Sequence, residues 1–182
     1  MASLVIRFID EPGVISRLIT WSTNSLWCHC EALSSDGQAW IGAHSGTGVD
    51  RRSLDWINPR RERRYAIPVA EHEAQTAHKW LDAQLGRKYN YLDILGLALH
   101  KRTWSPQRAI CSQLMLEFMQ QAGLQPLNVL PGFDALITPE MLHLSPLFIG
   151  RSVKPPSPSI QFAAHLVATA ITTPPLDDYW WT

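Results

Sequence analysis

The sequence lacks the features that place a chain in a membrane or in an oxidising compartment. Among its 182 residues there are three cysteines, Cys28, Cys30 and Cys111, and an odd number does not suit a framework of structural disulfides. No apolar run approaches the roughly 20 residues needed to span a bilayer. No N-terminal segment has the pattern of a signal peptide. We therefore expect a reduced, cytoplasmic chain without a transmembrane segment.

The sequence also lacks an excess of charge of either sign. Lysine and arginine together number 16, as do aspartate and glutamate, so the overall charge does not favour a nucleic-acid partner. Arginines do cluster locally at residues 51–52 and 60–64, around Trp56. We interpret them first as a solvated loop face, with a phosphate or lipid-headgroup contact as the less favoured alternative.

Apolar periodicity predicts alternating strands and helices over most of the chain. Strands are expected at residues 4–9, 26–33, 38–44 and 65–69, and helices at 14–21, 71–85, 90–99, 111–122 and 138–143. Pro68 indicates a sheet edge, and residues 45–49 are expected to form a loop. Residues 150–159 have the proline content of a linker.

The dipeptide Asp36-Gly37 lies between two strand-like runs, which is a strong signal for a β-hairpin. A two-residue turn there places His29 opposite His44. Glu31 then lies opposite Gly42, on the same face of the hairpin as the two histidines. A loop one residue longer would shift this pairing.

Cys111 is expected at the start of a buried helix that ends before Gly123. Unpaired backbone amides and the helix dipole would lower the pKa of its thiol, and a thiolate is a good nucleophile. The alternative is that Cys111 is simply a small buried apolar residue. His29 is the candidate base, because it lies in the middle of an otherwise apolar strand and a nucleophilic cysteine needs such a partner.

Several sequence blocks occur in a characteristic order: His29-Cys30-Glu31, then Gly86-Arg87-Lys88-Tyr89-Asn90-Tyr91, then Cys111-Ser112-Gln113-Leu114. Through them, residues 1 to about 148 resemble the circularly permuted branch of the NlpC/P60 family of papain-like proteins. The resemblance implies an α+β fold of permuted topology, with a small antiparallel sheet packed against helices. It also implies a cysteine hydrolase, acting as an amidase or peptidase or on an acyl ester or thioester.

In such a hydrolase Cys111 would attack a carbonyl and His29 would accept the thiol proton. The family's third polar residue falls near Ile41 and Gly42, neither of which can orient an imidazole. His44 and Glu31 are the two replacements, and the hairpin register favours His44. The substrate implied by the resemblance is a peptide or an acyl-lipid-like molecule.

The alternative function is a non-catalytic binding or structural module, for example a phage-related one, that retains the fold. No cofactor is expected in either case. We also expect no metal site, because Cys28 and Cys30 should point away from His29 and no second ligand pair has zinc spacing.

The chain is expected to divide into a domain at residues 1–148 and an extension at 149–182. The extension combines a proline-rich connection with an apolar run, Phe162–Ala168, and a terminal Tyr179–Trp181. Packing of this extension on its own domain is favoured over a homodimer contact or a lid, because monomers seldom leave such patches exposed.

Overall fold

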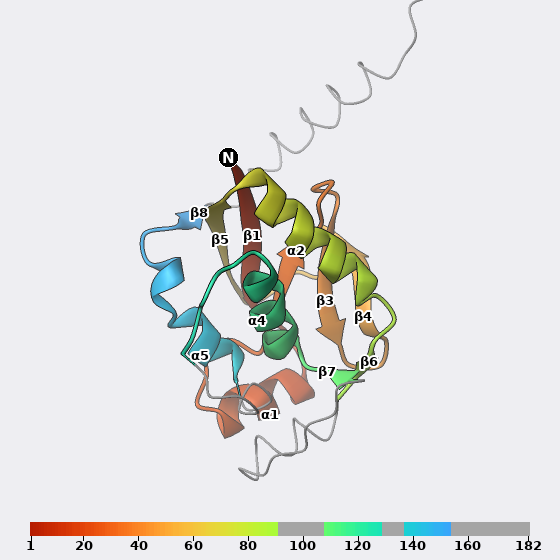
Figure 1. Ribbon diagram of the computed structural model, residues 1–182. Helices are drawn as coiled ribbons and strands as arrows, with labels where there is room; N and C mark the ends of the chain where they lie inside the picture. The colour runs from red at the N-terminus through yellow and green to blue at the C-terminus, as the bar shows by residue number, and fades with distance from the viewer. Residues whose placement is uncertain (91–107, 129–136, 154–182) are drawn as a thin grey trace, which may run out of the picture.

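The structure is a computed structural model that describes residues 1–90, 108–128 and 137–153. In this part of the chain, six antiparallel strands form one sheet in the order β4-β3-β2-β1-β5-β8 (Figure 1). These strands are β1 (Ala2–Asp10), β2 (His29–Leu33), β3 (Ala39–His44), β4 (Gly48–Ser53), β5 (Arg61–Val69) and β8 (Ser152–Val153). A short parallel pair, β6 (Lys88–Tyr89) and β7 (Arg108–Ala109), forms a separate two-stranded sheet.

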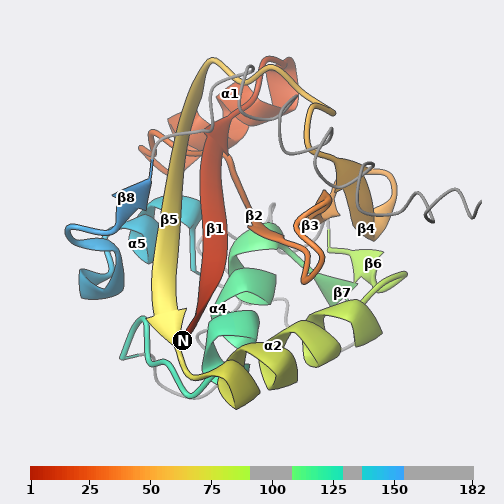
Figure 2. The same ribbon diagram turned by 90° about the horizontal axis from the view of Figure 1, so that it is seen from above.

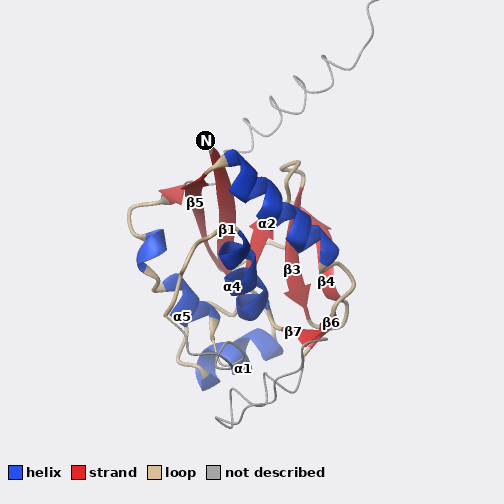
Figure 3. Cartoon of the chain, in the orientation of Figure 1, coloured by secondary structure: helices blue, strands red, loops and turns tan. Residues whose placement is uncertain are grey.

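The described helices are α1 (Val14–Ser22), α2 (Glu71–Ala83), α4 (Cys111–Gln121) and α5 (Pro139–His143), followed by a 3-10 turn, η2 (Pro146–Phe148). Figure 2 shows α2 and α4 on the same side of the sheet, with α1 at the end of the strands. Figure 3 separates the helical layer from the strands by colour. The expected α+β fold with a small antiparallel sheet packed against helices is therefore confirmed. None of the described helices is long and apolar enough to cross a bilayer.

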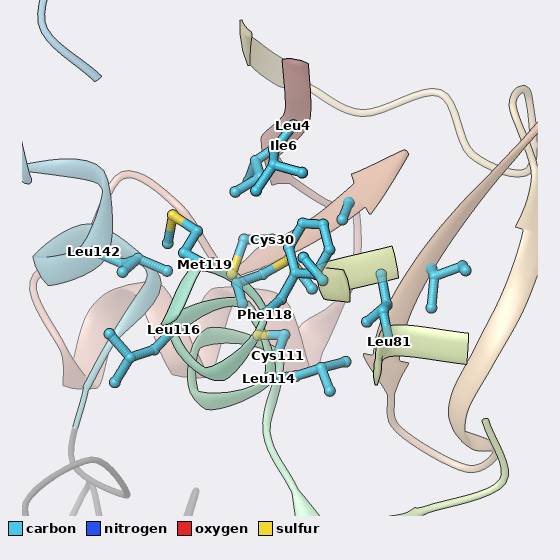
Figure 4. Packing of buried hydrophobic residues seen from close by; sticks show 14 of the residues in the cluster. Leu4, Ile6, Cys30, Leu81, Cys111, Leu114, Leu116, Phe118, Met119 and Leu142 are labelled. Carbon is cyan, nitrogen blue, oxygen red and sulfur yellow. The ribbon is translucent and has the colours of Figure 1, made fainter. Parts of the chain in front are cut away.

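The hydrophobic core lies between the sheet and α4. Alternate residues of each strand point to this side, so β1 contributes Leu4, Ile6 and Phe8, and β2 contributes Cys30 and Ala32. The helix contributes its own apolar face, drawn from close by in Figure 4. That face comprises Cys111, Leu114, Met115, Leu116, Phe118 and Met119, all of them buried.

The predicted register of the β2–β3 hairpin is confirmed. Leu33 pairs with Trp40 and Ala32 pairs with Ile41. The loop itself differs from a two-residue turn, because the Ser34 N–H donates to the Ala39 carbonyl (2.8 Å) and four residues lie between them. Both loops give the same pairing, so the side chains keep the predicted faces.

Other expectations need correction. The expected loop at 45–49 ends early, because Gly48 and Val49 already belong to β4. Strand β5 begins at Arg61 and not at residue 65, since charged residues at its start bind one another, as in the 2.7 Å bond from Arg64 Nε to Glu62. Residues 91–99 of the predicted helix at 90–99, and residues 154–182 of the extension predicted at 149–182, lie outside the described residues.

The start of α4 has no side-chain cap, because its N-cap position is occupied by Ile110. The Ser112 hydroxyl donates to the Ile137 carbonyl (2.5 Å). The serine therefore ties the helix to the segment before α5.

A substitution at Gly48 tests the contact between the edge strand β4 and the residues that precede β6. The Val49 N–H donates to the Arg87 carbonyl (2.8 Å), and a Cβ at Gly48 would overlap that same carbonyl. We expect Gly48→Ala to cost about 1–3 kcal/mol more than Gly46→Ala, because an overpacked contact adds to the strain of a positive φ. Gly46 has a similar φ, +94° against +88°, and open space around it. Urea unfolding of both variants measures the difference, and equal losses would contradict the contact.

Candidate functional site

Three buried polar side chains come together on the face of the sheet that points away from α4. His29 and Glu31 lie on β2 and His44 on β3, the neighbouring strand (Figure 1). Each offers a ligand atom, and these atoms all lie within 4.8 Å of one another. The two imidazole rings have their centroids 4.7 Å apart. The hairpin register that placed these residues on one face therefore also brings them into a single cluster.

Glu31 is held by a buried ion pair with Arg7. The β1–β2 ladder sets Arg7 directly opposite Glu31. The arginine Nε donates to Glu31 Oε1 at 2.8 Å and its Nη2 lies 2.6 Å from the same oxygen. The two side chains are 1% and 0% exposed, so both charges are removed from water. The second carboxylate oxygen, Oε2, has no hydrogen-bond partner in the described part of the chain.

His44 is oriented from its other side by Asp50 of β4. Its Nδ1 lies 2.5 Å from Asp50 Oδ1, although the N–H direction misses ideal hydrogen-bond alignment. Arg52 fixes that aspartate, because its Nε donates to the same oxygen at 3.1 Å. The remaining ring nitrogen, His44 Nε2, lies 3.5 Å from Glu31 Oε2. Asp50 thus occupies the position of the outer carboxylate that commonly orients a metal-bound histidine.

His29 is neutral at neutral pH. Burial lowers the pKa of its imidazole well below the ordinary value, and electrostatic interactions with His44, Arg7 and Arg52 lower it further. Its Nε2 is buried and has no hydrogen-bond partner among the described residues. A neutral imidazole with an unused nitrogen is the form that either binds a metal ion or accepts a proton.

Gly42 leaves the space between these groups open. A Cβ at this position would lie 3.1 Å from His29 Nε2 and 3.3 Å from His44 Cε1. Any other residue would therefore partly fill the gap toward which the two rings point. The cluster has the donor set that a metal ion requires, and its ligand atoms lie close enough together to share one, so the residues fit such a group.

The cluster opens into a cavity of about 250 Å³. Residues from the end of β1, from α1 and from β2 to β4 line it, including Glu11, Ser16, Cys28, His29, His44 and Arg52. Burial raises the pKa of the Cys28 thiol to about 11, so this cysteine is protonated at neutral pH. A small molecule in the cavity would meet both imidazoles, whereas Glu31 lies deeper.

The structure places Cys111 apart from this cluster. It is the first residue of α4, as predicted, but it packs into the core with Cys30, on the opposite face of the sheet. Burial raises the pKa of the Cys30 thiol, and a hydrogen bond with Cys111 raises it further. Cys111 is not among the described residues that line the cavity. Its role as a nucleophile activated by His29 stays a prediction.

Sequence reasoning missed the residues that support the cluster. Arg7 had a detectable signal, because a charged residue in the middle of an apolar strand needs a buried partner. Asp50 had none, since the strand that carries it follows a segment expected to be a loop. Arg52 was interpreted as part of a solvated loop face, but it lies on β4 and its side chain is only 23% exposed. Their positions became visible only with the β3–β4 pairing, which sets Gly42 opposite Asp50.

Comparison with known proteins gives one informative similarity. No family model matches the sequence, and no curated protein matches it. A solved structure, described as the metalloprotein yiiX (DUF1105) from Escherichia coli O157:H7, shares the fold with a TM-score of 0.62. The match covers 85% of this chain and 97% of that one, at 16% sequence identity.

This similarity corrects the resemblance inferred from sequence blocks. The structural match is to a DUF1105 metalloprotein, and no NlpC/P60 family model matches the chain. The assignment to the permuted NlpC/P60 branch was therefore wrong. Short blocks such as Cys111–Leu114 were given too much weight, since each reflects a local helix or turn requirement as well as a family.

The Arg7–Glu31 pair generates a stability prediction. In the metal-free protein, Arg7→Met should cost about 3–5 kcal/mol, because it leaves a buried carboxylate without a partner. Adding Glu31→Met should recover most of that loss, since both buried charges are then gone. Urea unfolding measures both variants. Arg51→Met, which breaks the exposed pair with Asp36, is the control and should change stability by about 0–1 kcal/mol. Additive losses in the double variant would contradict the pairing.

Proposed function

We propose that the protein is a metal-dependent hydrolase whose divalent transition-metal ion is held by His29, Glu31 and His44. The observation that supports this most directly is the convergence of three buried ligand atoms that make no hydrogen bond to the described residues, His29 Nε2, Glu31 Oε2 and His44 Nε2. Buried polar atoms are almost always hydrogen-bonded. Three such exceptions within one cluster are explained together by a ligand that all three atoms bind.

The donor set favours zinc or a similar ion. Imidazole nitrogens select transition metals over magnesium and calcium. Two histidines and one glutamate form the three-ligand set of several hydrolytic zinc sites, which keep one coordination position for water or substrate. The described metalloprotein that shares the fold supports a metal ion on this scaffold.

The cavity gives this centre access to a substrate. Bound at the cluster, the ion would act as a Lewis acid that polarises a carbonyl oxygen. The chain's own residues prepare the site: Asp50 orients His44, Arg7 offsets the charge of Glu31, and burial keeps His29 neutral. A volume of about 250 Å³ suits a small acyl or amino-acid group.

Metal binding is tested first on the chelator-treated protein. We expect one Zn²⁺ ion per chain by calorimetry, with affinity falling at least roughly 100-fold in His29→Gln and in His44→Gln, since each removes a ligand. His72→Gln is the matched control, because His72 is exposed on α2, and it should bind as the wild type does. Circular dichroism checks that the variants are folded. Unchanged affinity in both site variants would overturn the assignment.

Hydrolysis is tested separately with p-nitrophenyl acetate and alanine p-nitroanilide. Turnover should disappear when the metal is removed and return when Zn²⁺ is restored. A chain that binds Zn²⁺ at this cluster but hydrolyses neither compound would contradict the hydrolase and favour the binding module considered from the sequence.

A cysteine hydrolase is the second candidate, favoured by the position of Cys111 at the first residue of α4. There, helix N–H groups without helical partners would stabilise a thiolate. Cys111→Ser separates the two candidates. The metal-dependent reaction should keep its rate to within a few-fold, because the thiol lies on the far face of the sheet. Loss of turnover with intact Zn²⁺ affinity would instead assign the reaction to the cysteine.

A further inference from the structure

Glu11 lies at the end of β1 and its position is fixed through its backbone. Its N–H donates to the Cys28 sulfur at 3.1 Å, and its carbonyl accepts from Arg60 Nη2 at 2.9 Å. Arg60 is anchored in turn to Asp10, at 2.6 Å. These contacts hold residue 11 at the wall of the cavity that also exposes His29 and His44.

The Glu11 carboxylate has no structural task among the described residues. Other partly buried glutamates do: Glu62 binds Arg7 and Arg64, and Glu73 accepts from the Ala70 N–H. No hydrogen bond or ion pair holds the Glu11 side chain in the described part of the chain. Burial raises its pKa, and the nearby charge of Glu31 raises it further, while His44, Arg52 and Arg7 act in the opposite direction. A partly buried carboxylate without a partner lowers the stability of the folded protein. Residues at functional sites often carry such a cost.

We propose that Glu11 is the proton acceptor of the hydrolytic reaction at this site. This inference rests on the proposed function. Water attacks the substrate carbonyl carbon, and its proton passes to the Glu11 carboxylate as the new C–O bond forms and the carbonyl electron pair moves to oxygen. When that pair returns, the bond to the leaving group breaks, and Glu11 gives its proton to the departing nitrogen or oxygen. The products are a carboxylic acid and an amine or alcohol, and Glu11 is regenerated.

A role as proton acceptor explains why Glu11 lines the cavity and why its carboxylate makes no ion pair or hydrogen bond with the described residues. A proton acceptor must reach the attacking water, so it cannot be held in an ion pair on the far side of the site. A proton acceptor must also leave the open coordination position of the metal ion to water or substrate. Glu11 meets this condition, because it is not one of the three clustered ligand residues. One glutamate, Glu31, therefore binds the ion, and the other remains available for the proton.

The test compares Glu11→Gln with Glu71→Gln, an exposed control on α2. We expect Glu11→Gln to lower kcat for p-nitrophenyl acetate by about 10²–10⁴-fold, the range for loss of a general base. Zn²⁺ affinity should be unchanged, and the urea midpoint of the metal-free protein should rise, because the amide is cheaper to bury than an unpaired charge. Glu71→Gln should leave all three measurements unchanged.

The outcomes distinguish this inference from the proposed function. Wild-type turnover in Glu11→Gln would overturn the role of Glu11 alone, and a large loss of Zn²⁺ affinity would make Glu11 a metal ligand and overturn it as well. Failure of the wild-type protein to bind Zn²⁺ would overturn the proposed function itself. Retained affinity, lost turnover and raised stability together support the proton acceptor.

Discussion

The structure depends on a pair of opposite charges, Arg7 and Glu31, that are buried between β1 and β2. Two charges taken out of water are tolerated only when each is satisfied in place. Arg7 is satisfied by its surroundings, because its guanidinium carbon lies 4.2 Å from the centroid of the Trp40 ring and its Nη1 lies 3.4 Å from Glu62 Oε1. Glu31 is satisfied at one oxygen only. The ion pair therefore fixes the carboxylate while leaving one of its oxygens for another ligand.

Because side chains alternate along each strand, the Arg7–Glu31 pair and the apolar core lie on opposite faces of the sheet. On β2, Cys30 points into the core against Cys111, while His29 and Glu31 point to the opposite face with Arg7. The Cys30 thiol and the His29 imidazole, which are neighbours on β2, thus lie in separate environments. One environment is apolar and packed, and the other is polar and opens into a cavity. This division is why the arrangement supports a metal centre more directly than a cysteine–histidine pair.

The sequence was informative wherever structure follows from local pattern. Apolar periodicity predicted α2, α4 and the inner strands, and Asp36-Gly37 predicted the register that gathers His29, Glu31 and His44. The supporting residues could not be predicted in this way, since Asp50 and Arg7 reach the cluster through pairings between strands. No metal site was expected from the sequence, because the spacing of the cysteines does not match a zinc site. A histidine pair joined across a hairpin has no fixed spacing in the sequence.

The Arg7 charge also bears on which ions the cluster can hold. A carboxylate already neutralised by a guanidinium offers less electrostatic attraction to a dication than a free one does. The affinity must therefore come largely from the two imidazoles, and nitrogen donors favour zinc and its neighbours over calcium or magnesium. Asp50 supports this arrangement, because its carboxylate lies 2.5 Å from His44 Nδ1 and orients the ring. If the proposed metal site is correct, the same buried pair that fixes its geometry would favour a transition metal bound through nitrogen.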